Sequence, residues 1–369
     1  MKNSLRLLAL SLTVATAAYP APFLAVGDGA ELFLTAGLGV RADDNIFLNA
    51  NKVDDVIFDI KPGVELVFGN NSQTKGSFSY TENISRYSQN DGLDSELSSL
   101  RFNSDYDDGK TKFSARASFN QLNQNTIDSR LVGTLSRRDV TSAEIGGETS
   151  ASAKSKVAAK LRYNDTDYKR TGFNDNTTLA IPVNYYYAVT SKVDLSVGVR
   201  YRSTEIQNGI DSNDMFYRVG ARGDFTPNLT GEVQVGFGNR DFDNGRSEDI
   251  FDLDALLKFA LSPKTSLDLT ASNDFGVSGQ GAEQKNFSLG ARVTSKVSDA
   301  LSLNAGLNFR NIDYYTREDD YVEANLGVSY TVSKNVSIRG GYSYKKNDSG
   351  LVGGDFTNSV FNLAANLRY

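Results

Sequence analysis

Strict alternation of apolar and polar residues is the feature that most constrains what this chain can fold into. Residues 301–310 read LSLNAGLNFR, in which every second residue is apolar and the residues between them are polar or glycine. Because successive side chains of a β-strand point to opposite faces, this pattern predicts a strand with one apolar and one polar face. The apolar face needs a cover, which is either a second layer of protein or lipid.

The same alternation returns from about residue 30 to the end of the chain, interrupted by short polar turns at intervals of roughly 40 residues. Each interval holds two strands of about 10 to 14 residues, a length suited to a tilted membrane crossing, and one longer polar loop. Propeller blades repeat at a similar interval, but each blade needs four shorter strands. The short turns are residues 69–75, 107–110, 152–156, 190–192, 226–228, 262–265, 297–300 and 332–335.

The cover for the apolar faces is predicted to be lipid. No helical periodicity of useful length is present, and no segment after the N-terminus has the ~20 apolar residues of a membrane helix. Strands such as 193–202, 251–261 and 336–345 keep their charges on one face, as expected where a charge facing lipid costs about 2–4 kcal/mol. The predicted fold class is all-β: a transmembrane antiparallel up-and-down β-barrel of about 18 strands with both termini on the periplasmic side.

The N-terminus has the pattern of a secretory signal peptide. Lys2 and Arg6 precede the apolar run LLALSLTVATAA, and Ala15–Ala17 fits a small-residue cleavage site. We therefore expect Sec-dependent export with removal of residues 1–17, a short periplasmic segment over residues 18–30, and a barrel over residues 31–369 in the outer membrane of a Gram-negative cell. An uncleaved anchor is the alternative, although the apolar run is short for a membrane span.

Composition excludes much of enzyme chemistry. The chain has no Cys, no His and no Trp, so it has no disulfide, no thiolate or imidazole metal site and no Ser-His-Asp triad. A carboxylate pair for glycoside hydrolysis stays open, but no residue singles one out. We expect no enzymatic activity, no catalytic residues, no metal, no cofactor and no nucleic-acid partner.

The polar face of the strands is predicted to line an aqueous lumen. A basic wall that faces acidic residues favours anionic or polyhydroxylated solutes. The alternative is that these pairs only satisfy the interior of the barrel. The predicted basic lining is Arg116, Arg162, Arg200, Arg202, Arg218, Arg222, Arg240, Arg292, Arg310 and Arg339, with Arg41 and Lys160 on the same face. The predicted acidic lining is Asp194, Glu232, Asp252, Asp254 and Asp268, with Asp274 on the same face.

A few segments depart from the simple pattern. Residues 120–140 form the only loop long enough to fold inward as a constriction, and the strand after it is weakly patterned. Pro62 and Pro182 fall inside predicted strands, where proline removes a hydrogen-bond donor, so we expect a bulge or a strand boundary at each. In the run of three tyrosines at 185–187, we expect Tyr186 to face inward and its neighbours to lie in an aromatic girdle.

The C-terminal strand resembles the signal by which outer-membrane barrels are recognised for assembly. The signal residues are Phe361, Leu363, Leu367 and Tyr369, with tyrosine at the end in place of the more usual phenylalanine. The partners expected from this reading are the barrel-assembly machinery, outer-membrane lipid and lipopolysaccharide.

Residues 35–69 resemble the opening of a family of bacterial outer-membrane β-barrel porins associated with exopolysaccharide synthesis and export loci. The similarity lies in RADDNIF at Arg41–Phe47 and in DIKPGVEL at Asp59–Leu66, followed by alternating hairpins to the end of the chain. The resemblance implies transport of a polymer across the outer membrane, with a periplasmic polysaccharide-export partner. Three hypotheses follow: a polysaccharide-export channel, a general diffusion porin, and a non-conducting structural or adhesive barrel.

Overall fold

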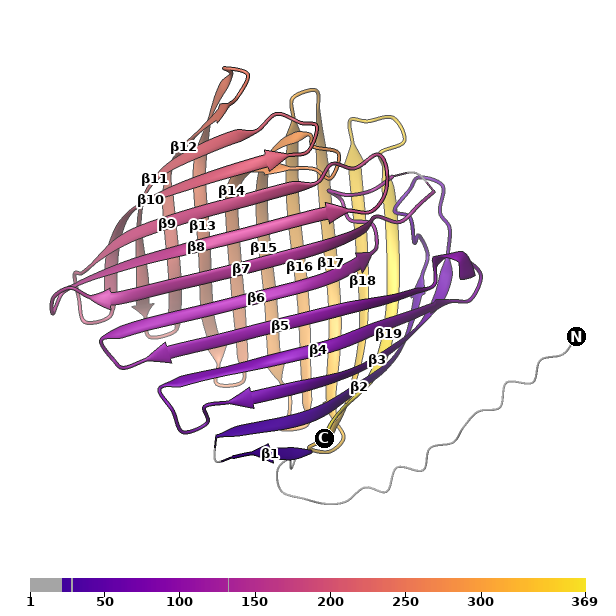
Figure 1. The fold of residues 1–369 in the computed structure, drawn as a ribbon, viewed down its shortest axis with the longest axis horizontal. Helices are drawn as coiled ribbons and strands as arrows, with labels where there is room; N and C mark the ends of the chain where they lie inside the picture. The colour runs from indigo at the N-terminus through magenta and orange to yellow at the C-terminus, as the bar shows by residue number, and fades with distance from the viewer. Residues whose placement is uncertain (1–21, 28, 132) are drawn as a thin grey trace, which may run out of the picture.

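The strands close into one barrel (Figure 1). The computed structural model describes residues 22–27, 29–131 and 133–369. The wall is closed where the last strand pairs with β2, from Val360 opposite Asp43 to Arg368 opposite Thr35. Its strands are β2 (Ala30–Asp43), β3 (Asp55–Phe68), β4 (Thr74–Tyr87), β5 (Ser95–Asp107), β6 (Thr111–Asn123), β7 (Arg137–Ser150), β8 (Ser155–Tyr168), β9 (Asn176–Ala188), β10 (Val193–Ile206), β11 (Ser212–Thr226), β12 (Leu229–Phe242), β13 (Ser247–Ser262), β14 (Thr265–Val277), β15 (Glu283–Lys296), β16 (Leu301–Tyr314), β17 (Arg317–Thr331), β18 (Val336–Ser349) and β19 (Phe356–Arg368).

This arrangement confirms the predicted all-β, antiparallel, up-and-down barrel. Each of the 18 wall strands pairs with its neighbours in the sequence, and β1 (Leu24–Val26) adds a short strand beside the start of β2. Part of the segment predicted over residues 18–30 is therefore a strand. The predicted signal peptide over residues 1–17 lies outside the described residues. Within the described ranges, no helix is long and apolar enough to cross a membrane.

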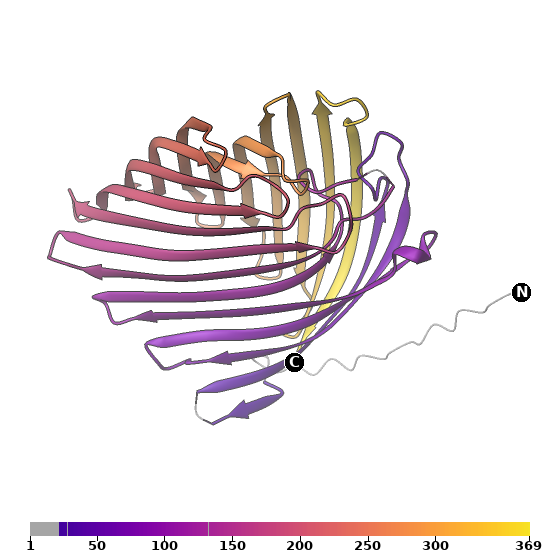
Figure 2. The same ribbon diagram turned by 45° about the horizontal axis from the view of Figure 1, so that its top comes forward.

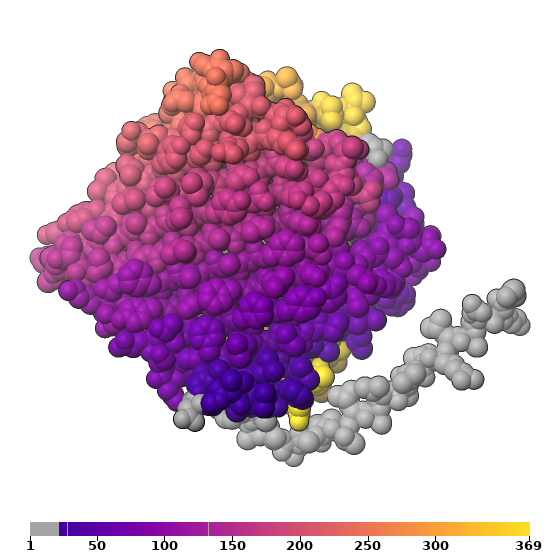
Figure 3. All heavy atoms as spheres, viewed as in Figure 1, coloured from indigo at the N-terminus to yellow at the C-terminus, as the bar shows by residue number. Residues whose placement is uncertain are grey.

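The two faces of the wall differ as the alternation predicts. On β10 the side chains of Leu195, Val197 and Val199 point outward and are 43–54% exposed, whereas Ser196 and Arg200 point inward and are 8% exposed. A soluble sandwich would bury the apolar face and expose the polar one. The apolar outside and polar inside are the arrangement of a transmembrane barrel. Figure 3 shows that side chains cover the side of the wall that faces the viewer.

The two ends of the barrel are also different. Short turns and the C-terminus lie at one end, and the longer loops lie at the other (Figures 1 and 2). Tyr369 stays in the sheet, because its N–H donates to the carbonyl of Leu34 at 2.9 Å and its carbonyl accepts from the N–H of Leu34 at 2.6 Å. We call these the short-turn end and the loop end.

Both prolines lie inside strands that continue past them without a register shift, so the expectation of a bulge or a strand boundary at each is wrong. The β3–β4 ladder skips Pro62, since its pairs stop at Ile60 and resume at Gly63. The β8–β9 ladder is interrupted in the same way beside Pro182, between Val183 and Ala180. Each proline therefore removes hydrogen bonds on one side only, while the ladder on the other side stays intact.

Candidate functional site

The polar side chains of the inner face meet across the lumen. Asp274 on β14 accepts hydrogen bonds from Arg200 at 2.9 Å and from Arg202 at 3.1 Å, both on β10. Strands β11, β12 and β13 lie between β10 and β14 in the wall, so these bonds can form only through the interior. Arg222 on β11 reaches Glu148 on β7 at 2.7 Å in the same way.

A buried network of ion pairs fills the lumen beside β10–β14. The carboxylate of Asp214 accepts from Arg202 at 2.5 Å and from Arg240 at 2.6 Å. Charges withdrawn from water are tolerated only when they are paired and hydrogen-bonded. These arginines of the predicted basic lining are therefore neutralised by their partners.

The same network continues around an aromatic ring. Asp252 is fully buried, pairs with Arg218, and lies 3.6 Å from Arg200. The guanidinium of Arg200 lies 3.8 Å from the centre of the Phe216 ring, a cation–π distance. Together with Asp274, these residues join the inner faces of β10, β11, β13 and β14 into one packed unit.

A second group lies nearer the short-turn end. Arg222 stacks on the ring of Tyr186 at 3.4 Å from its centre and pairs with Asp194 at 3.2 Å. Tyr186 is 4% exposed and donates its hydroxyl hydrogen to Glu232 at 3.2 Å. Tyr185 and Tyr187 are exposed on the outer face. The structure thus places Tyr186 inward, together with one basic and two acidic residues of the predicted lining.

Four further residues of the predicted lining have weaker ion pairs or none. Asp254 is 3.8 Å from Arg218, and Asp268 is 3.9 Å from Lys258. Arg292 and Arg339 are exposed on the inner face and make no ion pair or side-chain hydrogen bond within the described ranges. The inner surface therefore contains both neutralised and free cations.

The loop between β6 and β7, described over residues 124–131 and 133–136, folds into the lumen. Asp128 accepts a two-pronged bond from Arg310 on β16, at 2.6 and 2.8 Å. Arg130 donates to the carbonyl of Leu48 at 3.0 Å and to that of Gly354 at 2.6 Å, and burial lowers the pKa of its guanidinium from the ordinary value. The predicted inward segment, residues 120–140, thus spans from β6–β7 to the opposite wall.

A second loop, residues 44–54, also turns inward, which the sequence analysis missed. Ile46 and Phe47 pack with Ile57 and Leu135 into a buried apolar cluster at the loop end. Leu48 packs in a second cluster, with Tyr321 and Phe356. The available signal was the apolar run Ile46–Leu48 inside an otherwise polar loop, because apolar residues in a loop are buried only when the loop packs against something.

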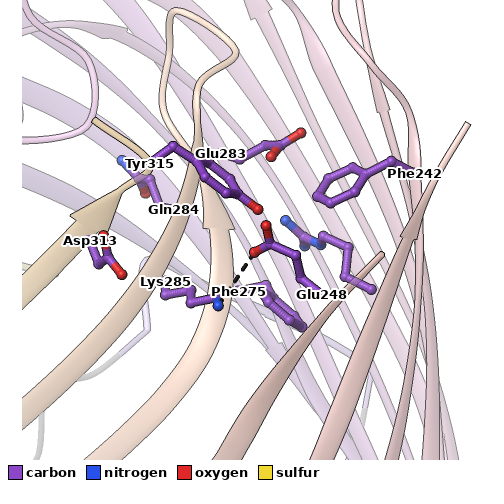
Figure 4. Close-up of a pocket in the computed structure, with 9 residues that line it drawn as sticks. Phe242, Glu248, Phe275, Glu283, Gln284, Lys285, Asp313 and Tyr315 are labelled. Atoms are coloured by element: carbon purple, nitrogen blue, oxygen red, sulfur yellow. Dashed lines mark ion pairs between the residues drawn. The ribbon is translucent and has the colours of Figure 1, made fainter. Parts of the chain in front are cut away.

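A small pocket opens at the loop end between β13 and β14 (Figure 4). The ladder between these strands stops at Leu253 opposite Asn273, and beyond it ion pairs connect the start of β13 with β15. Lys285 pairs with Glu248 at 3.4 Å, and Arg246 pairs with Glu283. Within the described ranges, no group of three or more acidic residues is arranged to hold a metal ion.

The four residues of the predicted assembly signal lie on the outer face of β19 or directly after it. Phe361 and Leu363 are 63% and 54% exposed, Tyr369 is 54% exposed, and Leu367 is 39% exposed. Their side chains are therefore available to lipid or to another protein.

Comparison with solved structures finds barrels of low sequence identity. The FrpB iron transporter from Neisseria meningitidis (F3-3 variant) is 11% identical with a TM-score of 0.49, and the match covers 85% of this chain and 62% of FrpB. OccK2 (OpdF) from Pseudomonas aeruginosa is 9% identical with a TM-score of 0.49, covering 92% of this chain and 97% of OccK2. OccAB3 from Acinetobacter baumannii is 10% identical with a TM-score of 0.48, covering 93% of this chain and all of OccAB3 (100%).

Comparison of the amino-acid sequence identifies the family of this chain. No curated protein matches it. The family model described as "Putative beta-barrel porin 2" matches residues 22–369, which is the whole barrel together with β1. The chain, a porin-like barrel of the outer-membrane type with a polar lumen and an inward-folded loop, belongs to the "Putative beta-barrel porin 2" family.

Proposed function

We propose that this protein is an outer-membrane channel through which anionic or polyhydroxylated solutes diffuse. The observation that carries the proposal is the loop over residues 124–136, which is fixed across a polar lumen by the pair Asp128–Arg310. A loop in this place narrows a wide barrel and selects solutes by size and charge. The exposed cations Arg292 and Arg339 favour anions in what remains of the lumen.

The inner wall over β16–β19 supports the polyhydroxylated part of the proposal. Amide side chains both donate and accept hydrogen bonds, so they can bind a hydroxyl group that acts as an acceptor or as a donor. The glycines among them lie under these amides, since a Cβ at Gly306 would meet the side chain of Asn325 at 2.8 Å and one at Gly327 that of Asn304 at 2.5 Å. The amides on the inner face of β16, β17 and β19 are Asn304, Asn308, Asn325, Asn362 and Asn366.

Export of a polysaccharide, which the family resemblance implies, is a further form of the proposal. A chain that passes through the lumen requires the anchored loop to leave its place, with a periplasmic partner to deliver the polymer. The same proposal includes Sec-dependent export with removal of residues 1–17. It also includes insertion by the barrel-assembly machinery and contact with lipopolysaccharide. The periplasmic location of the short-turn end is part of it as well.

A non-conducting barrel is the second candidate function, and the packing of side chains at the loop end favours it. There, the two inward loops and the clusters around Ile46 and Leu48 pack apolar side chains where a pore needs water. In that case the protein is a structural or adhesive barrel.

Swelling of liposomes that contain the refolded protein separates the two candidates. The channel predicts uptake of small sugars, with galacturonate entering faster than galactose because only the former is an anion. A closed barrel predicts the same optical trace as protein-free liposomes for both solutes, and that result contradicts the proposed function.

A further inference from the structure

We infer that the inner wall over β5–β8 holds a binding site for a sugar acid, with the carboxylate of the solute on arginine and its hydroxyls on neighbouring amides and hydroxyls. The inference rests on the proposed function, because it names a solute class and a place in the same lumen. It concerns a group of side chains with a surplus of positive charge. The network beside β10–β14 is balanced, because its four arginines face Asp214, Asp252, Asp274 and, at 3.8 Å from Arg218, Asp254.

The site is a cavity of about 310 Å³ on one stretch of wall. Sheet register aligns Asn103, Arg116, Glu144 and Arg162 in one row across β5, β6, β7 and β8. Arg101 lies two residues from Asn103 on the same face of β5, opposite Ser118. Side chains two residues apart on a strand share a face, so three guanidinium groups converge on this cavity.

The charges of this group do not balance. Glu144 is shared by Arg162 at 2.7 Å, by Arg116 at 3.5 Å and by Lys160 at 3.5 Å. The second carboxylate nearby, Asp105, is 3.1 Å from Arg116. Arg101 makes no ion pair or side-chain hydrogen bond within the described ranges. Four cations therefore face two carboxylates, and the surplus attracts an anion.

The donors are also accessible to a solute. The side chains of Arg116, Lys160 and Arg162 are 41–48% exposed, whereas Arg240 in the balanced network is 2% exposed. An accessible arginine whose partners are shared keeps free N–H groups. These groups can bind an incoming carboxylate in the two-pronged geometry that guanidinium favours.

The neutral residues of the cavity indicate a sugar acid rather than a simple anion. Asn103, Asn164, Ser118 and Ser142 line it beside the arginines. Amides and hydroxyls of this kind pair with sugar hydroxyls. The inward loop joins β6 to β7, two strands of this wall, so the site lies on the wall that carries the constriction.

Calorimetric titration of the full chain, refolded in detergent micelles, tests the inference with galacturonate, galactose and sulfate as probes. Galacturonate is expected to bind saturably and more tightly than either of the others. Arg101→Gln is expected to weaken galacturonate binding by about tenfold, the effect of one hydrogen-bonding group on a charged partner. Because Arg101 has no ion-pair partner among the described residues, its replacement leaves no carboxylate of these residues without a partner.

Arg170→Gln is the matched control, since Arg170 is also exposed and makes no ion pair or side-chain hydrogen bond within the described residues, but lies in the loop between β8 and β9. It is expected to leave galacturonate binding unchanged. The proposed site is overturned if the two variants lose galacturonate affinity equally, or if neither variant loses it. Galacturonate binding no more tightly than sulfate or galactose overturns the assignment to a sugar acid.

Binding is measured here without transport, so the two proposals fail separately. A barrel that binds galacturonate but passes no solute contradicts the proposed function and leaves the site standing. A barrel that conducts but shows no saturable binding contradicts the site and leaves the channel standing.

Discussion

Arg240 shows at the scale of one residue how the interior is held together. Its side chain is 2% exposed, pairs with Asp214 at 2.6 Å, and lies 4.6 Å from the centre of the Phe275 ring. It also donates to the carbonyl of Gly276 at 3.3 Å, where β14 has left its partner β13. Arg240 therefore replaces backbone hydrogen bonds that are missing between two strands.

Replacing Arg240 by methionine is expected to destabilise the barrel. The variant leaves a buried carboxylate with one partner fewer, which lowers the free energy of unfolding by about 3 kcal/mol. Urea unfolding followed by circular dichroism measures it. Arg339→Met is the control, because Arg339 is exposed and has no ion pair in the part of the chain that the structure describes. It is expected to change stability by less than about 0.5 kcal/mol. Equal effects of the two variants contradict the role of the network.

Asp128→Asn is expected to loosen the inward loop while leaving the wall intact. The variant weakens the two-pronged bond to Arg310, which keeps its bonds to Asn286 at 2.9 and 3.2 Å. Recordings in planar bilayers should then show a higher mean conductance and more frequent switching between current levels. Asp268→Asn makes the same charge change on the wall, away from the loop, and should leave the switching unchanged. Identical traces for wild type and Asp128→Asn contradict the role of the pair.

At the scale of the element, the sequence predicted the strands better than their ends. The predicted strand over residues 301–310 extends to Tyr314 in β16, and the one over 193–202 extends to Ile206 in β10. The extra residues lie at the loop end, where outward residues such as Ser203 and Glu205 are polar. Alternation marks a strand only where its faces meet different surroundings, so it fades where both faces are polar.

The inner face was predictable from parity, but the partners across the lumen were not. The bond between Arg200 and Asp274 depends on how the closed wall curves, which no local pattern contains. Arg101 was missed although it shares the inner face, because Leu97 and Leu100 fall on opposite faces of β5 and blur the alternation. The inward packing of Ile46–Leu48 depends on contacts with distant strands.

Two neighbouring residues of β17 test which face meets lipid. Leu326 points outward and is 61% exposed, and Asn325 points inward. Leu326→Arg is expected to lower the free energy of unfolding in liposomes by about 2–4 kcal/mol, the cost of a charge at the lipid face. Asn325→Arg should leave stability nearly unchanged and increase the preference for anions. The reverse ranking in urea unfolding contradicts the assignment of the faces.

The whole molecule has an asymmetric lumen. Buried ion pairs fill the side beside β10–β14, amides and glycines line β16–β19, and loops with apolar clusters cover the loop end. Cavities remain on the inner wall, one of about 310 Å³ beside β5–β8 and one of about 490 Å³ beside Arg292. Passage through such a molecule depends on the space beside the anchored loop, so conduction is the property that separates a channel from a closed barrel.

Single-channel current through the refolded protein without residues 1–17, in a planar bilayer, tests this central claim most directly. The account predicts a stable, open, ohmic current whose reversal potential in a salt gradient shows a preference for anions. Absence of current from β-rich, heat-modifiable protein contradicts the channel, and a preference for cations contradicts the role of the lumenal arginines.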